Sequence, residues 1–220
     1  MLGAVELGDM ELLDGAMLRL VPLDVAPPPP VVIDLTDAVR TPAGYVERLR
    51  LTDWFDGAYG PATRLYKAYF LRLPDPSGLD YWARSRRGGR TLASISQQFS
   101  RSSEFDRRYG KLTNAAFIDT IYQNVFDRAP DPSGRAFYLG RLNDGRWSRG
   151  QVVLQFSESS EYERKMRGTV AVVELARGMN GRAPSQAQVD TLLATYATGG
   201  TDGVFAALLG SPGYATRVRG

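Results

Sequence analysis

Apolar residues recur at helical spacing along most of the chain after about residue 60. Phe99 follows Ile95 by four positions, and Phe156 follows Val152 by the same distance. Side chains four positions apart lie on one face of a helix, so each pair predicts a buried stripe. The spacing predicts an all-α fold in which tandem repeats of short helices form a compact bundle.

The first 59 residues follow a different pattern. Asp14-Gly15 lies between two short apolar runs, an arrangement typical of a hairpin turn. The run Ala26–Pro30 contains four consecutive prolines and predicts a stiff, extended spacer. Thr41-Pro42 then predicts the start of a helix. We therefore expect an irregular or β-hairpin segment with a proline linker over residues 1–30 and a lead-in helix over residues 31–59.

From residue 60 onward one series of residue types occurs twice in the same order. It consists of an Arg, a Pro-Asp-Pro-Ser-Gly sequence, an aromatic pair, a glycine and a Ser-Ser-Glu-aromatic ending. The first copy contains Arg72, Pro74–Gly78, Tyr81-Trp82, Gly88-Gly89 and Ser102–Phe105, and the second contains Arg128, Pro130–Gly134, Phe137-Tyr138, Gly145 and Ser159–Tyr162. The offset is 56 residues at the Pro-Asp motif and 57 at the Ser-Ser-Glu motif, so one residue was inserted between them.

A third copy is present in a degraded form. Arg182-Ala183-Pro184-Ser185 replaces the Pro-Asp motif, Gly199-Gly200 the central glycines, and Ser211–Tyr214 the ending. Terminal repeats are often atypical because one of their faces has no neighbour. We therefore expect helical repeats over residues 60–110 and 111–167, followed by a degenerate capping repeat over residues 168–220.

The motif residues are those that helix starts require. An Asp followed by Pro fits the position before a helix, because its carboxylate accepts hydrogen bonds from the first turn while the Pro needs no donor. Ser and Thr accept in the same way. Six residues are therefore predicted to cap helices: Asp75, Asp131, Thr91, Ser148, Ser102 and Ser159.

Two ion pairs are predicted within the repeats. Arg72 and Arg128 each precede the Pro-Asp motif, and Glu104 and Glu161 stand at the ends of the same repeats. We expect Arg72 to pair with Glu104 and Arg128 to pair with Glu161, in partly buried positions. In the third copy the Arg is kept as Arg182, but Gly213 occupies the Glu position.

Composition narrows the chemistry that the chain can perform. The sequence contains no Cys and no His, which excludes thiol nucleophiles, disulfides, imidazole or thiolate metal ligands and His-based triads. We expect no metal site and no cofactor. Charge is unevenly distributed, because residues 1–60 have a net charge of −6 and residues 61–220 a net charge of +9.

The duplicated motif resembles a bacterial family known as domain of unknown function 4214 (DUF4214). Its pattern of Arg-x-Pro-Asp-x-x-Gly-x-x-Tyr-Trp followed by Phe-x-x-Ser-x-Glu-Phe is matched by Arg72, Pro74, Asp75, Gly78, Tyr81, Trp82, Phe99, Ser102, Glu104 and Phe105, and again by Arg128, Pro130, Asp131, Gly134, Tyr138, Phe156, Ser159, Glu161 and Tyr162. The family is distantly similar to the linker domains of phycobilisomes. The resemblance implies no catalytic residues.

The resemblance implies a non-catalytic structural or interaction module, because similar domains occur in secreted and surface-attached bacterial proteins. We expect a role in adhesion, scaffolding or assembly at the bacterial cell surface or outside the cell, with a protein partner or self-association. The start of the sequence lacks the features of a signal peptide, which leaves a cytoplasmic location open. No run of apolar residues is long enough to predict membrane insertion.

Two alternative functions remain open at this stage. Arg84, Arg86, Arg87 and Arg90 form a dense basic stretch that favours an acidic glycan or another polyanion, although no nucleic-acid motif accompanies it and nucleic acid is not an expected partner. A carboxylate-based glycan hydrolase would use a pair chosen from Asp119, Asp127, Asp144 and Glu158. No motif selects any of these four.

Overall fold

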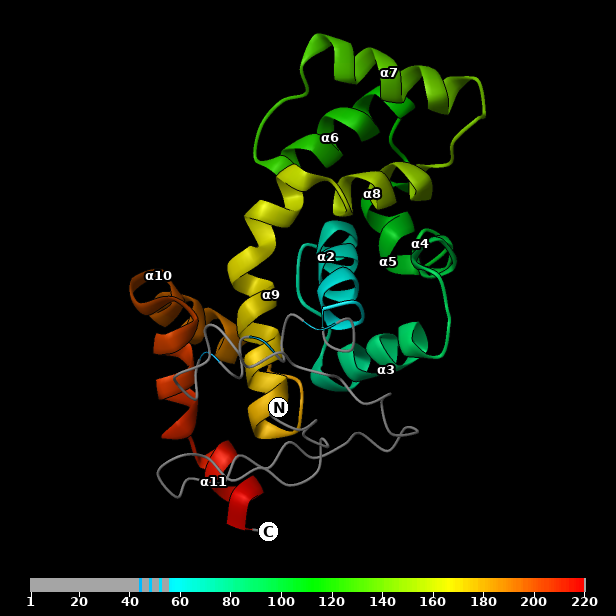
Figure 1. The fold of residues 1–220 in the computed structure, drawn as a ribbon. Helices are drawn as coiled ribbons and strands as arrows, with labels where there is room; N and C mark the ends of the chain where they lie inside the picture. Colours follow the sequence, from blue (N-terminus) through cyan, green and yellow to red (C-terminus); the bar gives the residue numbers. More distant parts are fainter. Residues whose placement is uncertain (1–43, 45–47, 49–51, 53–55, 220) are drawn as a thin grey trace, which may run out of the picture. The chain divides into compact units, whose positions relative to one another are not determined.

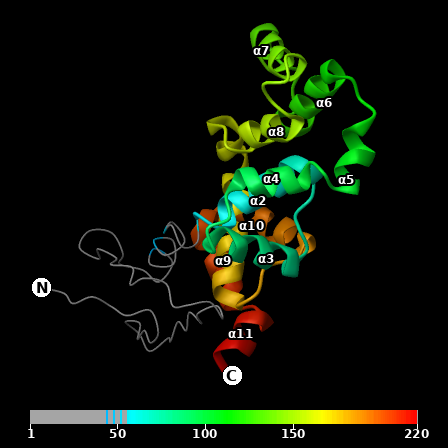
Figure 2. The same ribbon diagram turned by 90° about the vertical axis from the view of Figure 1, so that its right-hand side faces the viewer.

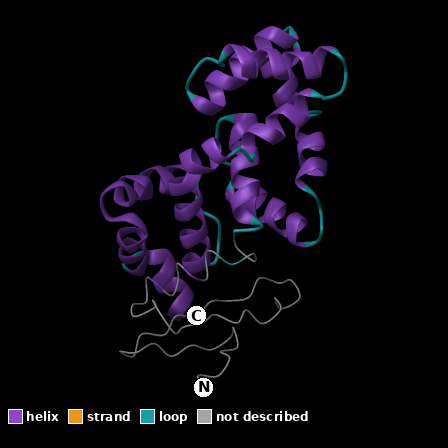
Figure 3. Ribbon diagram, turned by 45° about the horizontal axis from the view of Figure 1, so that its top comes forward, coloured by secondary structure: helices purple, strands orange, loops and turns teal. Residues whose placement is uncertain are grey.

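The computed structural model describes residues 44, 48, 52 and 56–219. The predicted hairpin at Asp14-Gly15, the proline spacer and most of the lead-in helix lie outside the described residues. Within the described part every regular element is helical and no strand is present (Figure 1 and Figure 3). The prediction of an all-α fold is therefore confirmed.

Ten α-helices and one π-helical turn follow one another between residues 59 and 219 of the described part. They are α2 (Tyr59–Phe70), α3 (Pro76–Arg87), α4 (Leu92–Phe99), α5 (Ser103–Phe105), η1 (Asp106–Gly110), α6 (Asn114–Phe126), α7 (Pro132–Asn143), α8 (Arg149–Ser157), α9 (Ser160–Asn180), α10 (Gln186–Leu209) and α11 (Pro212–Arg219).

The described residues group into two compact units. Unit 1 contains residues up to 60, 75–84 and 168–219, and unit 2 contains residues 61–74 and 85–167. The repeat boundaries expected from the sequence stay predictions, and the one placed between residues 167 and 168 falls inside α9.

All three repeats share one order of helices and turns. Every described residue with a positive φ lies at one of two equivalent places: Leu71, Asp127 and Gly181 follow the first helix of a repeat, and Gly89, Gly145 and Gly200 follow the second. At Gly200 the turn is a kink inside α10. The third copy thus keeps a positive φ at both places although its motif residues have changed.

Equivalent aromatic rings form the cores of the two complete repeats. Phe99 lies 5.4 Å from Tyr66 and 5.2 Å from Phe70, measured between ring centroids. In the second repeat the equivalent ring, that of Phe156, lies 4.8 Å from Tyr122 and 5.0 Å from Phe126. The stripes that the sequence predicts are therefore the buried faces of α4 and α8.

Helices α4 and α8 pack closely against each other in unit 2 (Figure 2). At Gly150 of α8, an added Cβ would meet the side chains of Ser100 and Tyr69 at 3.0–3.1 Å, so glycine allows this close approach. The Oγ of Ser96 donates to the carbonyl of Gly150 at 2.8 Å, and the Tyr69 hydroxyl lies 2.6 Å from the same Oγ. Burial raises the pKa of Tyr69, which keeps this hydroxyl protonated as part of the contact.

Unit 1 is built around the C-terminal half of α9, where residues 170–177 are all buried. Two charged residues lie in this buried stretch, Glu174 and Arg177. The Nε of Arg177 donates to Asp80 of α3 at 2.7 Å, and the hydroxyl of Tyr59 donates to the same carboxylate oxygen at 2.8 Å. A largely buried ion pair therefore joins residues 97 positions apart.

The left-handed conformation of Leu71 leads to a prediction. Leu71 has a φ of 60°, a conformation that is strained for a residue with a Cβ and unstrained for glycine. We expect Leu71→Gly to raise the free energy of unfolding by about 1 kcal/mol in urea denaturation. Leu209, which is similarly exposed but helical, is the control. Leu209→Gly should lower stability, and a loss with both variants would contradict the strain at Leu71.

Candidate functional site

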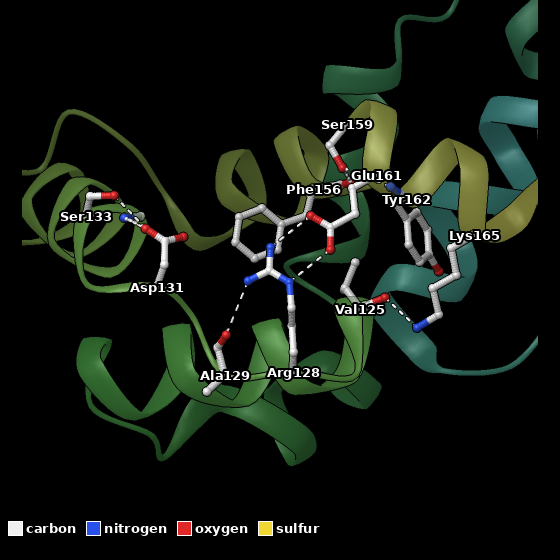
Figure 4. Close-up of polar contacts among 11 residues, drawn as sticks. Val125, Arg128, Ala129, Asp131, Ser133, Phe156, Ser159, Glu161, Tyr162 and Lys165 are labelled. Carbon is white, nitrogen blue, oxygen red and sulfur yellow. Dashed lines mark hydrogen bonds and ion pairs between the residues drawn. The ribbon is translucent and has the colours of Figure 1, made fainter.

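Polar contacts tie the turn between α6 and α7, here called the corner, to the start of α9 in the second repeat (Figure 4). Arg128 donates from Nε and Nη2 to the two carboxylate oxygens of Glu161, at 3.0 and 2.9 Å. It also donates from Nη1 to the carbonyl of Ala129 at 3.3 Å, and its guanidinium lies over the ring of Tyr122 at 5.5 Å. This arrangement links the turn before α7 to the first residues of α9.

The helix starts at this corner are capped by the predicted side chains. Asp131 Oδ1 accepts from the Ser133 hydroxyl at 2.5 Å and from the Gly134 amide at 2.8 Å. These bonds stabilise the carboxylate, and they lower the pKa of Asp131. Ser159 accepts from the amide of Tyr162 at 3.3 Å at the start of α9.

The first repeat contains the same corner. Arg72 donates to Glu104 through Nε and Nη2 at 3.3 and 2.9 Å, and its guanidinium lies 5.3 Å from the ring of Tyr66. Asp75 accepts from the amide of Gly78 at 2.6 Å, at the start of α3. In the third copy Arg182 is exposed, and Ser211 donates to Asn180 instead.

The remaining predicted caps also lie at helix starts. Thr91 accepts from the amide of Ser94 at 3.1 Å, Ser102 from that of Phe105 at 3.2 Å, and Ser148 from that of Gln151 at 3.3 Å. Sequence reasoning missed three further caps. Thr113 caps α6, Ser185 caps α10 and Ser211 caps α11, and each could have been found from the Thr or Ser that precedes a helix.

We expect the Arg128–Glu161 ion pair to contribute weakly to the free energy of unfolding and to lose this contribution in acid. The side chains are 44% and 43% exposed, and exposed pairs contribute about 0.2–1 kcal/mol. The bond to Arg128 lowers the pKa of Glu161 below its ordinary value near 4.5, so its stabilisation is present above pH 4.5 and is lost as pH falls through the lowered pKa. A double-mutant cycle with Arg128→Gln and Glu161→Gln, measured by urea denaturation at several pH values from 7 downward, should give this coupling at pH 7 and a decreasing coupling as the pH falls below 4.5. A coupling that does not decrease with falling pH would contradict it.

The predicted basic stretch does not form one exposed cluster. Arg84 is exposed, but Arg86 and Arg87 each have a buried guanidinium nitrogen. Arg86 donates to the carbonyl of Arg90 at 3.0 Å, and Arg90 donates to the side chain of Gln98. Much of this positive charge is therefore engaged within the chain.

The four candidate carboxylates each pair with a different cation. Asp119 accepts from Arg135 at 2.6 and 2.8 Å, and Asp127 pairs with Lys165 at 2.7 Å. Asp144 pairs with Arg146 at 3.2 Å, and Glu158 pairs with Arg64 at 2.8 Å. Burial raises the pKa of Glu158, and the bond to Arg64 opposes this effect. The structure therefore gives each of the four carboxylates a separate structural contact.

A group of aromatic rings around one arginine lies on the outer side of α7. The α7 patch consists of Phe137, Tyr138, Arg141 and Trp147. The Arg141 guanidinium lies 5.2 Å from the ring centroid of Phe137 and 5.8 Å from that of Trp147. The rings of Phe137 and Trp147 meet edge to face at 5.7 Å. Phe137 is 47% exposed, so this patch presents both an apolar surface and a positive charge.

The described residues include no group of three acidic side chains that could together bind a metal ion. Within the same part of the chain, no helix combines the length and the apolar character needed to cross a membrane.

Comparison with known proteins agrees with the geometry of the repeats. Residues 96–166, which include the whole second repeat motif, match the model of the family described as Domain of unknown function (DUF4214). The family predicted from the duplicated motif is confirmed, and residues 96–166 belong to it. No match was found among curated proteins or among solved structures.

Proposed function

We propose that this chain is a non-catalytic structural or interaction module that mediates adhesion, scaffolding or assembly at the cell surface of a bacterium or outside the cell. One observation carries the proposal: the residues that define the duplicated motif make structural contacts. Arg72 and Arg128 bind the glutamates that end their repeats, and Asp75 and Asp131 cap helices. These charged motif residues therefore fix the helices, and exposed side chains that take no part in those contacts are available for partners.

The exposed face of α7 supports an interaction role. Leu142, which is 9% exposed, is the one buried residue of α7, whereas the equivalent helix α3 buries Leu79 and Ala83. The side chains that α7 leaves uncovered include Phe137, with Arg141 and Trp147 beside it. Trp, Tyr and Arg are the residue types that contribute most to binding at protein interfaces. We therefore place the contact surface on the α7 patch.

Self-association of the full-length protein tests this assembly role. Light scattering coupled to size exclusion should show a molar mass that rises with protein concentration, because the apolar rings of the α7 patch are covered on association. Phe137→Ser should shift this rise to at least tenfold higher concentration. Leu209→Ser, which changes an exposed leucine elsewhere, is the control. A wild-type protein that stays monomeric at all concentrations, or an equal effect of the two variants, would contradict the proposal.

The proposed location requires a separate measurement. Antibody detection on intact cells and in culture medium of the source bacterium should find the protein at the surface or outside. Detection only after cell lysis would contradict a surface role and would leave the self-association result unaffected.

A further inference from the structure

The guanidinium of Arg141 is positioned by aromatic rings and has no carboxylate partner among the described residues. It lies over Phe137 and Trp147, and no ion pair involves it in the described part of the chain. The nearby carboxylate of Asp144 accepts from Arg146, both from its backbone amide at 3.0 Å and from its side chain at 3.2 Å. The charge of Arg141 is therefore held in place without being neutralised by these neighbours.

This arrangement is suited to bind a carboxylate. A guanidinium is planar and always charged, and its fork of N–H donors matches the two oxygens of a carboxylate. Contacts with the two rings restrict the rotation of the side chain, so less conformational entropy is lost on binding. The exposed ring of Phe137 beside it favours an apolar side chain. A ligand of the α7 patch should therefore present acidic and apolar residues together.

The arginine and the tryptophan are not part of the duplicated motif. The position of Arg141 in the second repeat corresponds to Ser85 in the first, where no equivalent charge is present. The turn between α3 and α4 likewise contains no tryptophan that corresponds to Trp147. The combination of Arg141 and Trp147 with an exposed ring is thus a feature of the second repeat, whereas the exposed ring of Phe137 has an equivalent in Tyr81.

The chain itself contains a segment with the required chemistry. Residues 1–25 contain five acidic residues and one arginine, a net charge of −4, interspersed with Leu, Val and Met. The acidic residues are Glu6, Asp9, Glu11, Asp14 and Asp24. This charge is opposite to the net charge of +9 on residues 61–220, so the segment and the repeats attract each other at long range.

We propose that the α7 patch binds residues 1–25 of a second copy of this chain. Arg141 pairs with a carboxylate of the segment, and Phe137 and Trp147 cover its apolar side chains. We assign the segment to another copy because the proposed function is assembly between copies. Segment and patch are different surfaces, so the contact either is exchanged reciprocally within a dimer or continues head-to-tail through a ring or chain of molecules. This inference rests on the proposed assembly function and names its partner.

The test measures binding of a fluorescein-labelled peptide of residues 1–25 to the full-length chain by fluorescence anisotropy. The acceptor is a full-length variant in which Glu6, Asp9, Glu11, Asp14 and Asp24 are changed to the matching amides, so that its own segment does not compete. We expect Arg141→Gln in this acceptor to weaken peptide binding at least tenfold. Arg101→Gln, an exposed arginine of the same unit, is the matched control and should leave binding unchanged. Urea denaturation of each variant confirms that it is folded.

The acidic residues of the segment should be needed both for peptide binding and for self-association. A peptide with the five amides should bind at least tenfold more weakly than the acidic peptide, and the amide variant of the chain should be monomeric where the wild type associates. If the acceptor with Arg141→Gln binds the peptide as tightly as the acceptor that keeps Arg141, the α7 patch is not the binding site. If the wild type associates but the acceptor with the five amides does not bind the acidic peptide, the assigned partner is overturned and the proposed function stays intact. A monomeric wild type whose amide variant binds the peptide would show contact within one chain, against a second copy.

Discussion

Asp80→Ala is expected to lower the free energy of unfolding by about 3–5 kcal/mol, the range observed when one partner of a buried ion pair is removed. The change would leave the Arg177 guanidinium, whose side chain is only 8% exposed, without its carboxylate. The Tyr59 hydroxyl would lose its acceptor at the same time. Urea denaturation monitored by circular dichroism measures the effect. Asp190→Ala, which removes an exposed carboxylate from α10, should change stability by less than about 0.5 kcal/mol.

A compensating double variant distinguishes a lost ion pair from a lost packing contact. Buried ion pairs can be replaced by apolar residues of similar size with little loss of stability. The variant Asp80→Leu with Arg177→Met should therefore recover most of the stability lost in Asp80→Ala. A double variant that is less stable than Asp80→Ala alone would show that unit 1 needs the charges themselves.

Phe156→Ala is expected to cost about 3–5 kcal/mol, the usual loss for a fully buried phenylalanine. Only 1% of Phe156 is exposed, and its ring contacts Tyr122, Phe126 and Tyr138 at centroid distances of 4.8–5.0 Å. Truncation would leave a cavity among these rings that the helices of the second repeat cannot close without moving. Thermal unfolding and urea denaturation measure the loss.

Phe137→Ala provides the contrast for Phe156→Ala, because it removes the same side chain from the surface of the same repeat. It should cost less than about 1 kcal/mol of stability. If Phe137→Ala were as destabilising as Phe156→Ala, the α7 patch would be part of the core and would not be available to a partner. If Phe156→Ala cost less than 1 kcal/mol, the ring cluster would not be the core of the repeat.

The sequence predicted the local features of the repeats and the two ion pairs that recur in both, and it missed contacts between distant segments that occur only once. A cap such as Asp131 depends on residues within three positions of it, so its signal is contained in a short run of sequence. The pairing of Arg128 with Glu161 could be proposed because the same two residue types recur in the first repeat. The contact of Asp80 with Arg177 has no such copy, since the position equivalent to Asp80 in the second repeat is Ala136.

The candidate interaction site was also only partly predictable. The aromatic pairs were visible as part of the motif, but which rings become exposed depends on what packs against α3 and α7. The density of charge in the sequence predicted a binding site at Arg84–Arg90. In the structure it is the guanidinium of Arg141 that lies against two aromatic rings. An isolated Arg whose neighbours come from two elements leaves no pattern that composition or spacing detects.

The left-handed residue after the first helix of each repeat matters for sequence searches that look for further copies of this repeat. This position holds Leu71, Asp127 and Gly181 in turn, although φ is positive in all three. A search that requires glycine there would find only the last and most degraded copy. Alignments of related chains should be scored instead on the arginine that follows and on the Asp or Ser that caps the next helix.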